Sequence, residues 1–216
     1  EMAASMVKIA VPSTLQQSIV HVGILLVQAV INSFGSTALA GYSAGMRIES
    51  LSIVPMLAMG NAMSTFTAQN MGAGNIDRVK KGYQMCYVIV LTAGAVLCVM
   101  YQLAGGAFVS LFLDSGSSEA YSVGLSYVKF LSFFYSFIGL KASTDGLLRG
   151  AGDVTAFTVA NLVNLAIRVS VTNLFAPIYG IQVAWMAVPL GWAANYVISF
   201  GWYLTGKWKK VRVIKK

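Results

Sequence analysis

The chain has 216 residues, of which 57% are hydrophobic and only 10% charged, and its formal net charge is +8. Soluble domains usually carry about 25% charged residues, so this composition excludes an ordinary water-soluble fold. The basic residues lie beside apolar stretches and not on an amphipathic face, which argues against nucleic-acid binding and for membrane topology signals.

Four long stretches of the chain contain no Asp, Glu, Lys or Arg; they cover residues 9–46, 50–76, 82–113 and 169–206. About 20 apolar residues in a helix cross the hydrocarbon core of a bilayer, and each stretch exceeds that length. The sequence therefore predicts an all-α, polytopic membrane protein. We find no Ser/His/Asp, Cys/His or paired-carboxylate arrangement, so we expect neither an enzyme nor a bound cofactor.

Six spans separated by turn residues can be drawn, and we treat residues 1–216 as one six-helix domain. Asp77 and Asp153 are the expected N-caps of the third and fifth spans. The third span is longer than one crossing, and Gly105-Gly106 is its expected weak point. The six predicted spans are about 9–33, 38–71, 78–113, 118–148, 154–176 and 180–205, followed by a basic tail at 207–216.

Proline and glycine mark the expected hinge points of the bundle. Pro55 lies well inside the second span, where it removes one backbone hydrogen bond and is expected to kink the helix. Two Gly-Ala-Gly segments, at 72–74 and 150–152, follow the second and fourth spans. We interpret Gly72, Gly74, Gly150 and Gly152 as helix ends and hinge points, because neither segment has the residues of a phosphate-binding loop.

The positive charges alternate between the two sides of the predicted spans. Four lie within spans, and the opposite loops hold only the acids Asp114 and Glu119. The positive-inside rule then places both chain ends in the cytoplasm, in the inner or plasma membrane of a cell. One side receives Lys8, Arg78, Lys80, Lys81, Arg149 and six tail residues, Lys207, Lys209, Lys210, Arg212, Lys215 and Lys216.

Polar residues inside the first span form one helical stripe. Gln17, His21, Gln28 and Asn32 follow one another at +4, +7 and +4, so they share a face. Facing lipid would be unfavourable, so the stripe either makes hydrogen bonds between helices or forms the polar wall of a substrate cavity. His21 has no Cys, Asp or Glu at metal-ligand spacing, so we expect no metal site.

The fifth span carries a similar stripe of Asn161, Asn164, Arg168 and Thr172 at +3, +4 and +4. The same two interpretations, helix packing and cavity wall, remain open for it. Together the two stripes give the candidate cavity residues: Gln17, His21, Gln28, Asn32, Asn161, Asn164 and Arg168.

Only two acids lie inside the predicted spans, Glu49 and Asp145. Asp145 falls between Lys141 and Arg149 at successive i+4 positions, which predicts an ion ladder near the end of the fourth span. The ladder is either mutual neutralisation or evidence that Asp145 is a titratable coupling group. Glu49 and Asp145 are therefore the candidate ion-coupling residues.

Several segments resemble the MATE (multidrug and toxic compound extrusion) transporters, over the whole chain. The residues at 8–12 and 34–40 look like the first helix of a MATE lobe and the entry to its second. The segment Arg47-Ile48-Glu49 with Pro55, running to Gln69-Asn70-Met71-Gly72-Ala73-Gly74, resembles the second helix. Leu148–Asp153 and the end of the chain from 180 to 210 are also similar to the family.

The resemblance implies a twelve-helix transporter of which this chain is the second six-helix lobe. It implies secondary active antiport: export of organic cations or amphipathic drugs in exchange for sodium or protons, by alternating access. The expected partners are the missing N-terminal lobe, membrane lipids and the exported compounds. Because the chain begins at Glu1 and not at Met, we expect a fragment.

One departure from the family limits what the resemblance implies. Some members carry a Glu in the first helix of this lobe and an Asp midway along the fourth, and this sequence has Val20 or His21 and residues 136–139 (Ser-Phe-Ile-Gly) there. A coupling site of that kind is therefore not expected here. Two alternatives stay open: a lipid or polysaccharide-precursor flippase of related architecture, and a half-size, non-transporting membrane protein.

Overall fold

The computed structural model describes residues 18–114 and 118–210, and in that part of the chain it contains α-helices and one 3-10 helix but no strand. The first helix is described from Ser18 to Asn32. The other elements are α2 (Ser36–Gly72), α3 (Ile76–Ser110), α4 (Ser118–Ser132), α5 (Tyr135–Gly150), α6 (Val154–Tyr179), α7 (Gln182–Thr205) and the 3-10 helix η1 (Lys207–Lys210). The all-helical fold expected from composition is confirmed.

Within residues 18–114 and 118–210, four helices are long and apolar enough to cross a membrane: α2, α3, α6 and α7. The pair α4 and α5 would make a fifth crossing if it acts as one bent span. The predicted first span, 9–33, lies partly outside the described residues. Large apolar side chains such as Leu51, Leu103 and Val197 are exposed on the outside of the bundle, as expected for helices that face lipid.

The predicted fourth span, 118–148, corresponds to two helices, α4 and α5. It breaks at residues 133–134, and α4 and α5 are bent by 54° relative to each other. The break contains two adjacent aromatic residues, Phe133 and Phe134, and no proline. Phe133 is exposed, whereas Tyr135 immediately after the break is buried in the core.

The prediction of a weak point at Gly105-Gly106 in the third span is wrong, because α3 runs without interruption through these two residues. Gly105 is buried, and a Cβ built there would meet Leu125 and Lys129 of α4 at van der Waals distance. Asp77 does not cap α3, since the helix begins at Ile76 and Asp77 pairs instead with Lys80 at 2.8 Å. The expected cap at Asp153 is confirmed: its Oδ1 accepts the N–H of Ala156 at 3.4 Å.

Glycines allow α2 to approach its neighbours closely. A Cβ at Gly41 would collide with Ala120 of α4, and a Cβ at Gly146 of α5 would collide with the carbonyl oxygen of Gly60. Small residues at helix contacts are typical of membrane bundles, where packing replaces the hydrophobic effect as the force between helices. α2 is therefore the central helix against which α3, α4 and α5 pack.

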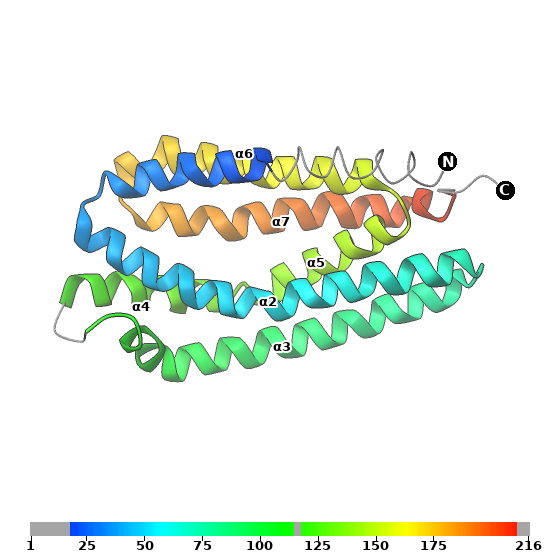
Figure 1. The fold of residues 1–216 in the computed structure, drawn as a ribbon, viewed down its shortest axis with the longest axis horizontal. Helices are drawn as coiled ribbons and strands as arrows, with labels where there is room; N and C mark the ends of the chain where they lie inside the picture. The colour runs from blue at the N-terminus through cyan, green and yellow to red at the C-terminus, as the bar shows by residue number, and fades with distance from the viewer. Residues whose placement is uncertain (1–17, 115–117, 211–216) are drawn as a thin grey trace.

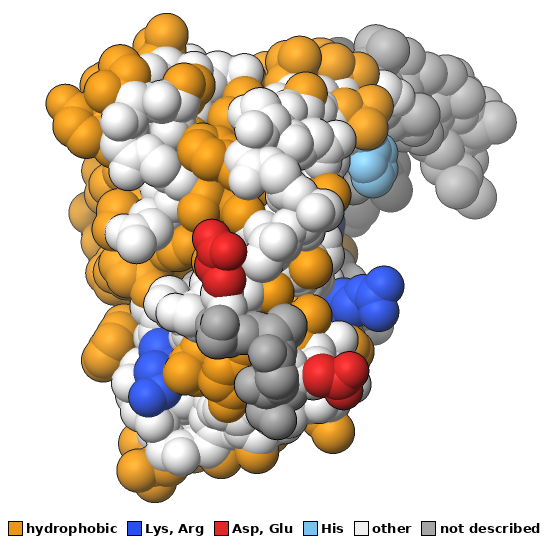
Figure 2. All heavy atoms as spheres, turned by 90° about the vertical axis from the view of Figure 1, so that its left-hand side faces the viewer, with side chains coloured by type: hydrophobic (Ala, Val, Ile, Leu, Met, Phe, Trp, Pro, Cys, Tyr) orange, Lys and Arg blue, Asp and Glu red, His pale blue; other side chains and the backbone are white. Residues whose placement is uncertain are grey.

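The helices run roughly parallel or antiparallel along the long axis of the molecule, so that their connections gather at two ends (Figure 1). One end holds the connections after α2, α5 and α7, with the basic residues Arg78, Lys80 and Lys81 nearby. Figure 2 looks onto the other end, which shows mainly hydrophobic and uncharged side chains.

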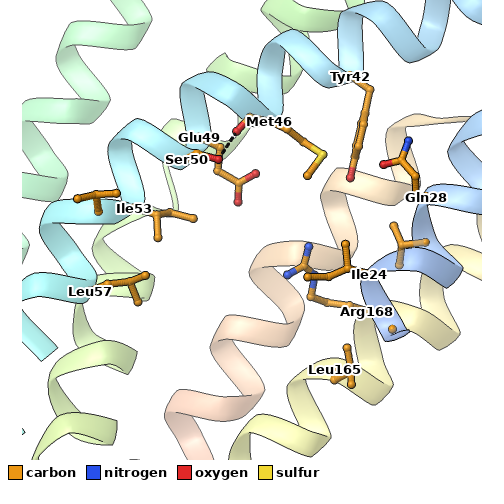
Figure 3. A pocket seen from close by; sticks show the side chains of 13 residues that line it. Ile24, Gln28, Tyr42, Met46, Glu49, Ser50, Ile53, Leu57, Leu165 and Arg168 are labelled. Atoms are coloured by element: carbon orange, nitrogen blue, oxygen red, sulfur yellow. Dashed lines mark hydrogen bonds between the residues drawn. The ribbon is translucent and has the colours of Figure 1, made fainter. Parts of the chain in front are cut away.

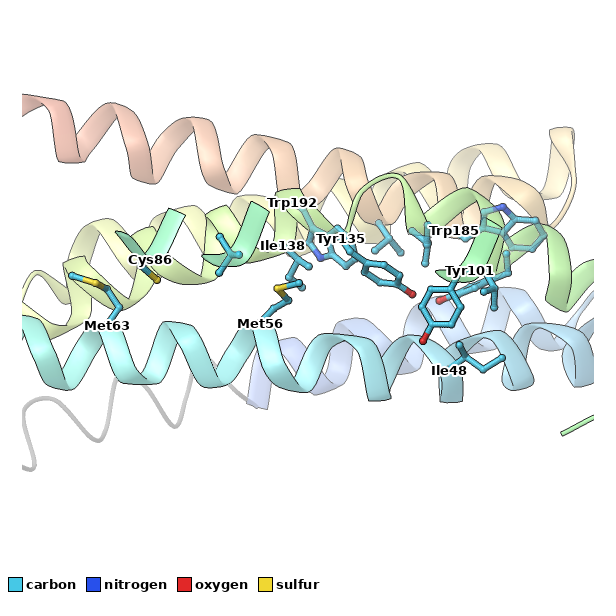
Figure 4. Close-up of a cluster of buried hydrophobic side chains, with 14 of the residues drawn as sticks. Ile48, Met56, Met63, Cys86, Tyr101, Tyr135, Ile138, Trp185 and Trp192 are labelled. Carbon is cyan, nitrogen blue, oxygen red and sulfur yellow. The ribbon is translucent and has the colours of Figure 1, made fainter. Parts of the chain in front are cut away.

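The centre of the bundle is filled by buried aromatic and aliphatic side chains (Figure 4). Tyr101 and Tyr135 lie with their ring centroids 5.9 Å apart, between α3 and α5. Met56 from α2 and Trp192 from α7 complete the contact across the bundle. This core joins α2, α3, α5 and α7, and it also includes Tyr127 of α4 and Ile31 of the first helix.

Candidate functional site

A cavity of about 350 Å³ lies where the first helix, α2 and α6 come together (Figure 3). Most of its wall is aliphatic. Five polar or charged side chains interrupt that wall: Gln28, Tyr42, Glu49, Ser50 and Arg168. The full lining is Gly23, Ile24, Val27, Gln28, Tyr42, Met46, Glu49, Ser50, Ile53, Val54, Leu57, Leu165 and Arg168.

Glu49 is the acidic group of this cavity. It lies on α2 and is only 8% exposed. Its Oε2 accepts a short hydrogen bond from the hydroxyl of Tyr127, a fully buried residue of α4. A buried carboxylate is costly unless other groups stabilise its charge, so Tyr127 holds the carboxylate in a defined position at the cavity wall.

Arg168 is the basic group, and it comes from the middle of α6 on the facing wall. The side chains of Glu49 and Arg168 point into the same space in Figure 3. Arg168 interacts electrostatically with Glu49 and Tyr42, but within the described residues it forms no ion pair or hydrogen bond. The cavity thus presents one carboxylate and one guanidinium that do not neutralise each other by direct contact.

Gln28 and Tyr42 add neutral hydrogen-bonding groups to the same cavity. The Gln28 Nε2 atom donates to Oδ1 of Asn32 at 3.1 Å, so the amide is oriented by a neighbour one turn away on the first helix. The Tyr42 ring packs edge-on against Tyr127, with centroids 5.3 Å apart. The arrangement can bind an amphipathic molecule with charged and hydrogen-bonding groups.

A second polar cluster lies deeper, between α5, α6 and α7. Lys141 and Asp145 form an ion pair with 3.0 Å between Nζ and Oδ2. Asn161 accepts from Lys141 at 3.0 Å and donates to Asp145 Oδ2 at 3.2 Å. Ser199 of α7 donates to Asp145 Oδ1 at 2.7 Å, so this carboxylate is fully engaged and links three helices.

The predicted ion ladder extends over only two of its three members. Arg149 turns away from Asp145 and reaches α2 instead, where its Nη2 atom donates to Oδ1 of Asn61 at 2.7 Å and its Nε atom to Ser64 at 3.4 Å. The predicted pairing of Lys141 with Asp145 is observed. The prediction that Asp145 also pairs with Arg149 is wrong.

The two predicted polar stripes do not each form one wall. Gln28 and Arg168 line the cavity, whereas His21 and Asn32 are exposed and Asn161 belongs to the deeper cluster. Asn164 packs against Gly191 of α7, and its buried Oδ1 has no partner among the described residues. Gln17 lies outside the described residues.

The expected hinge residues lie at two kinds of position. Pro55 is inside α2, which continues through it, and Gly72 is the last residue of that helix. Gly74 and Gly152 have positive φ angles of 75° and 84°, a backbone conformation that favours glycine. Gly150 ends α5, but a Cβ there would collide with Ser64 of α2, so it is also a packing residue.

Four residues of these two sites were not predicted from the sequence: Tyr42, Met46, Tyr127 and Ser199. Tyr42, Met46 and Glu49 follow one another at +4 and +3, which is the spacing of one helical face, so the first two could have been found from Glu49. Tyr127 and Ser199 belong to other helices, and no spacing in the sequence relates them to Glu49 or Asp145.

Comparison with known proteins decides the family. The model of the MatE family matches residues 12–174. The chain belongs to the MatE family. It is 28% identical to the probable multidrug resistance protein YpnP of Bacillus subtilis, over 99% of this chain and 48% of that protein. It is 21% identical to the probable multidrug resistance protein NorM of Thermotoga maritima, over 97% of this chain and 45% of that protein.

Solved structures confirm the MatE fold. The chain superposes on an outward-facing MATE family multidrug resistance transporter with a TM-score of 0.85 and 19% identity, covering 95% of this chain and 47% of that one. For an inward-facing MATE family transporter the TM-score is 0.79, with 17% identity over 92% of this chain and 45% of that one. This MatE chain therefore spans about half the length of the relatives it matches.

Proposed function

We propose that this MatE chain forms one lobe of a secondary active exporter of organic cations and amphipathic drugs, driven by sodium or protons. Membership of the family and the likeness to multidrug resistance proteins support this proposal. The observation that carries it is the cavity around Glu49: a carboxylate set among aliphatic side chains of membrane helices. Such a cavity can bind the charged and the apolar parts of an amphipathic cation together.

The proposal includes a second lobe. The chain matches only about half of its relatives' length, and the Glu49 cavity lies at the side of the bundle formed by the first helix, α2 and α6. A second six-helix lobe and membrane lipids would be its partners. Rocking of two lobes about a shared cavity would give alternating access. From the basic residues near the α2–α3 connection we infer that this end of the bundle and both chain ends face the cytoplasm, with the protein in the inner or plasma membrane.

Glu49 is a better candidate for ion coupling than Asp145. Coupling requires a group that can exchange one cation for another within the cavity. Glu49 lines the cavity and has one described hydrogen-bond donor, Tyr127. Asp145 already has Lys141, Asn161 and Ser199 around it and does not line the cavity. We therefore assign coupling to Glu49 and a structural role to Asp145.

The cavity charges do not favour the alternative of a flippase for phosphate-bearing lipids. Such a protein needs an excess of cationic groups at its substrate site. Here Arg168 is offset by Glu49 in the same cavity, and Lys141 is paired with Asp145 outside it. The cavity charges do not bear on the other alternative, a half-size, non-transporting membrane protein. The reading frame upstream of Glu1 would test that alternative.

Drug-accumulation assays on the full-length protein that contains this chain test the proposal. Cells or vesicles would be loaded with a fluorescent organic cation, and the sodium and proton gradients would be collapsed one at a time. We expect export that stops when one of the two gradients is removed. Export that survives the loss of both gradients would contradict secondary active transport.

Glu49→Gln in the same assay tests the cavity. We expect it to reduce export about tenfold or more, because Glu49 supplies the only carboxylate among the described residues that line the cavity and glutamine keeps the side-chain size. Glu119→Gln is the matched control: Glu119 is an exposed residue at the start of α4, outside the cavity, and we expect normal export from that variant. Equal export from both variants would remove the Glu49 cavity from the transport pathway.

A further inference from the structure

We propose that Arg168 is a specificity-determining residue that binds an anionic group of the substrate, so that the cavity prefers zwitterionic amphiphiles to simple cations. This inference rests on the proposed transport function and goes beyond it, because it names the charge pattern that the cavity selects.

The guanidinium of Arg168 has no direct partner among the described residues. Arg168 lines the cavity, and the described residues offer it no ion pair and no hydrogen bond. A guanidinium has five N–H donors in a planar fork that fits a carboxylate or a phosphate. Inside a membrane bundle such a group is costly unless a partner or water satisfies it. Arg168 is therefore available for an anionic ligand.

Helix α7 restricts the position of the Arg168 side chain. A Cβ at Gly191 would lie 3.0 Å from Cγ of Arg168 and would collide with Oδ1 of Asn164. The arginine stem thus passes tightly over the glycine. The stem is held against α7, and the guanidinium extends into the space between α6 and α2 (Figure 3). This is a defined position and not that of a freely moving surface arginine.

The two charges of the cavity favour a zwitterion over a simple cation. A simple cation bound at Glu49 would lie in the same 350 Å³ space as Arg168, and repulsion between like charges is strong where water is scarce. A zwitterion avoids this cost, because its cationic centre can approach Glu49 while its carboxylate approaches Arg168. The aliphatic wall formed by Ile53, Leu57 and Leu165 accommodates the apolar part of the molecule.

Two related dyes provide the test. Rhodamine B carries a delocalised cation and a carboxylate, and its ethyl ester carries the same cation without the negative charge. Binding of each dye to the purified full-length protein in lipid nanodiscs would be measured by fluorescence anisotropy, and export would be measured in vesicles. We expect the wild type to bind rhodamine B about tenfold more tightly than the ester.

Arg168→Gln should abolish this preference. We expect binding of rhodamine B to weaken about tenfold, while binding of the ester stays the same or improves, because a like charge has been removed. Arg168→Lys should retain part of the preference, since it keeps the charge but loses the planar fork. Gly191→Ala should act in the same direction as Arg168→Gln by displacing the arginine stem.

Arg47→Gln is the matched control. Arg47 is an exposed arginine of α2 whose guanidinium carbon lies 5.9 Å from the centroid of the Phe112 ring, outside the cavity, so its loss should leave both dyes unaffected. A wild type that binds the ester as tightly as the acid, or binds neither dye, would overturn the proposal, as would equal weakening of both dyes by Arg168→Gln.

The failure of this inference can be told apart from failure of the proposed function. If gradient-driven export of simple cations is intact but no preference for rhodamine B depends on Arg168, only the inference is wrong. If the dyes bind with the expected preference but no export of either depends on a gradient, the inference stands and the transport function is wrong.

Discussion

Lys141 and Asp145 form a buried ion pair within one helix, one turn apart on α5, with 3.0 Å between Nζ and Oδ2. The pair does more than neutralise itself. Asn161 of α6 bonds to both members, and Ser199 of α7 bonds to the carboxylate. Asp145 is therefore the point at which α5, α6 and α7 are tied together in the interior of the lobe.

Asp145→Asn should destabilise the folded protein strongly. The change leaves the Lys141 ammonium buried without a counter-charge, and breaking a buried pair from one side costs about 3–5 kcal/mol. Thermal denaturation of the purified full-length protein would measure this. The double variant Lys141→Met with Asp145→Asn removes both charges, so it should recover most of the lost stability and transport. If the double variant is stable but inactive, Asp145 takes part in coupling and the structural role is incomplete.

Gly146→Ala should destabilise the contact between α2 and α5. The new methyl group would collide with the carbonyl oxygen of Gly60, and this backbone cannot move without shifting a whole helix. Overpacking of this kind costs about 1–3 kcal/mol. Gly72→Ala is the control, because a Cβ there meets nothing within 4 Å. Thermal denaturation in detergent should show a lower transition for the first variant only. Equal transitions would show that the two helices can move apart at little cost.

The class of fold follows from the sequence because lipid imposes a simple rule. Charge-free stretches longer than one bilayer crossing must be helices, and Gly72, Gly150 and Gly180 come at or beside the observed helix ends. The break at Phe133-Phe134 was not predictable in this way, since no proline or glycine marks it. Gly105-Gly106, which sequence rules mark as weak, stays helical because it packs on α4.

The candidate site was predictable only in part. Polarity within a span identifies Gln28, Glu49 and Arg168, because such residues are costly in lipid and need a protein or water environment. Which of them meet depends on how helices far apart in the chain are rotated against each other. Asn161 and Arg168 share a face of α6, yet one contacts Lys141 and the other lines the cavity. Spacing along one helix cannot separate these two environments.

Trp208→Ala should release the end of the chain from α7. Trp208 is fully buried, its ring stacks on Tyr203 at a centroid distance of 5.6 Å, and its Nε1 donates to the Tyr203 carbonyl at 3.0 Å. Replacing a buried tryptophan costs about 3–5 kcal/mol where the site cannot collapse. Hydrogen exchange of residues 203–210 should become much faster in this variant. Lys209→Ala removes an exposed side chain whose Nζ lies 5.7 Å from the centroid of the Trp208 ring, so it should increase the exchange far less than Trp208→Ala.

Tyr127→Phe should leave the Glu49 carboxylate less firmly held at the cavity wall. The variant keeps the ring contacts with Tyr42 and Trp185 but removes the hydroxyl that donates to Glu49. A hydrogen bond to a charged group contributes about 1.5–3 kcal/mol, so both thermal stability and export should fall. Tyr42→Phe is the matched control for thermal stability alone, since the described residues show no hydrogen bond from its hydroxyl but that hydroxyl lines the cavity. Among the described residues, Tyr127 alone donates a hydrogen bond to Glu49. An equal loss of thermal stability in the two variants would therefore show that the carboxylate does not depend on this hydroxyl and that both tyrosines act through packing alone.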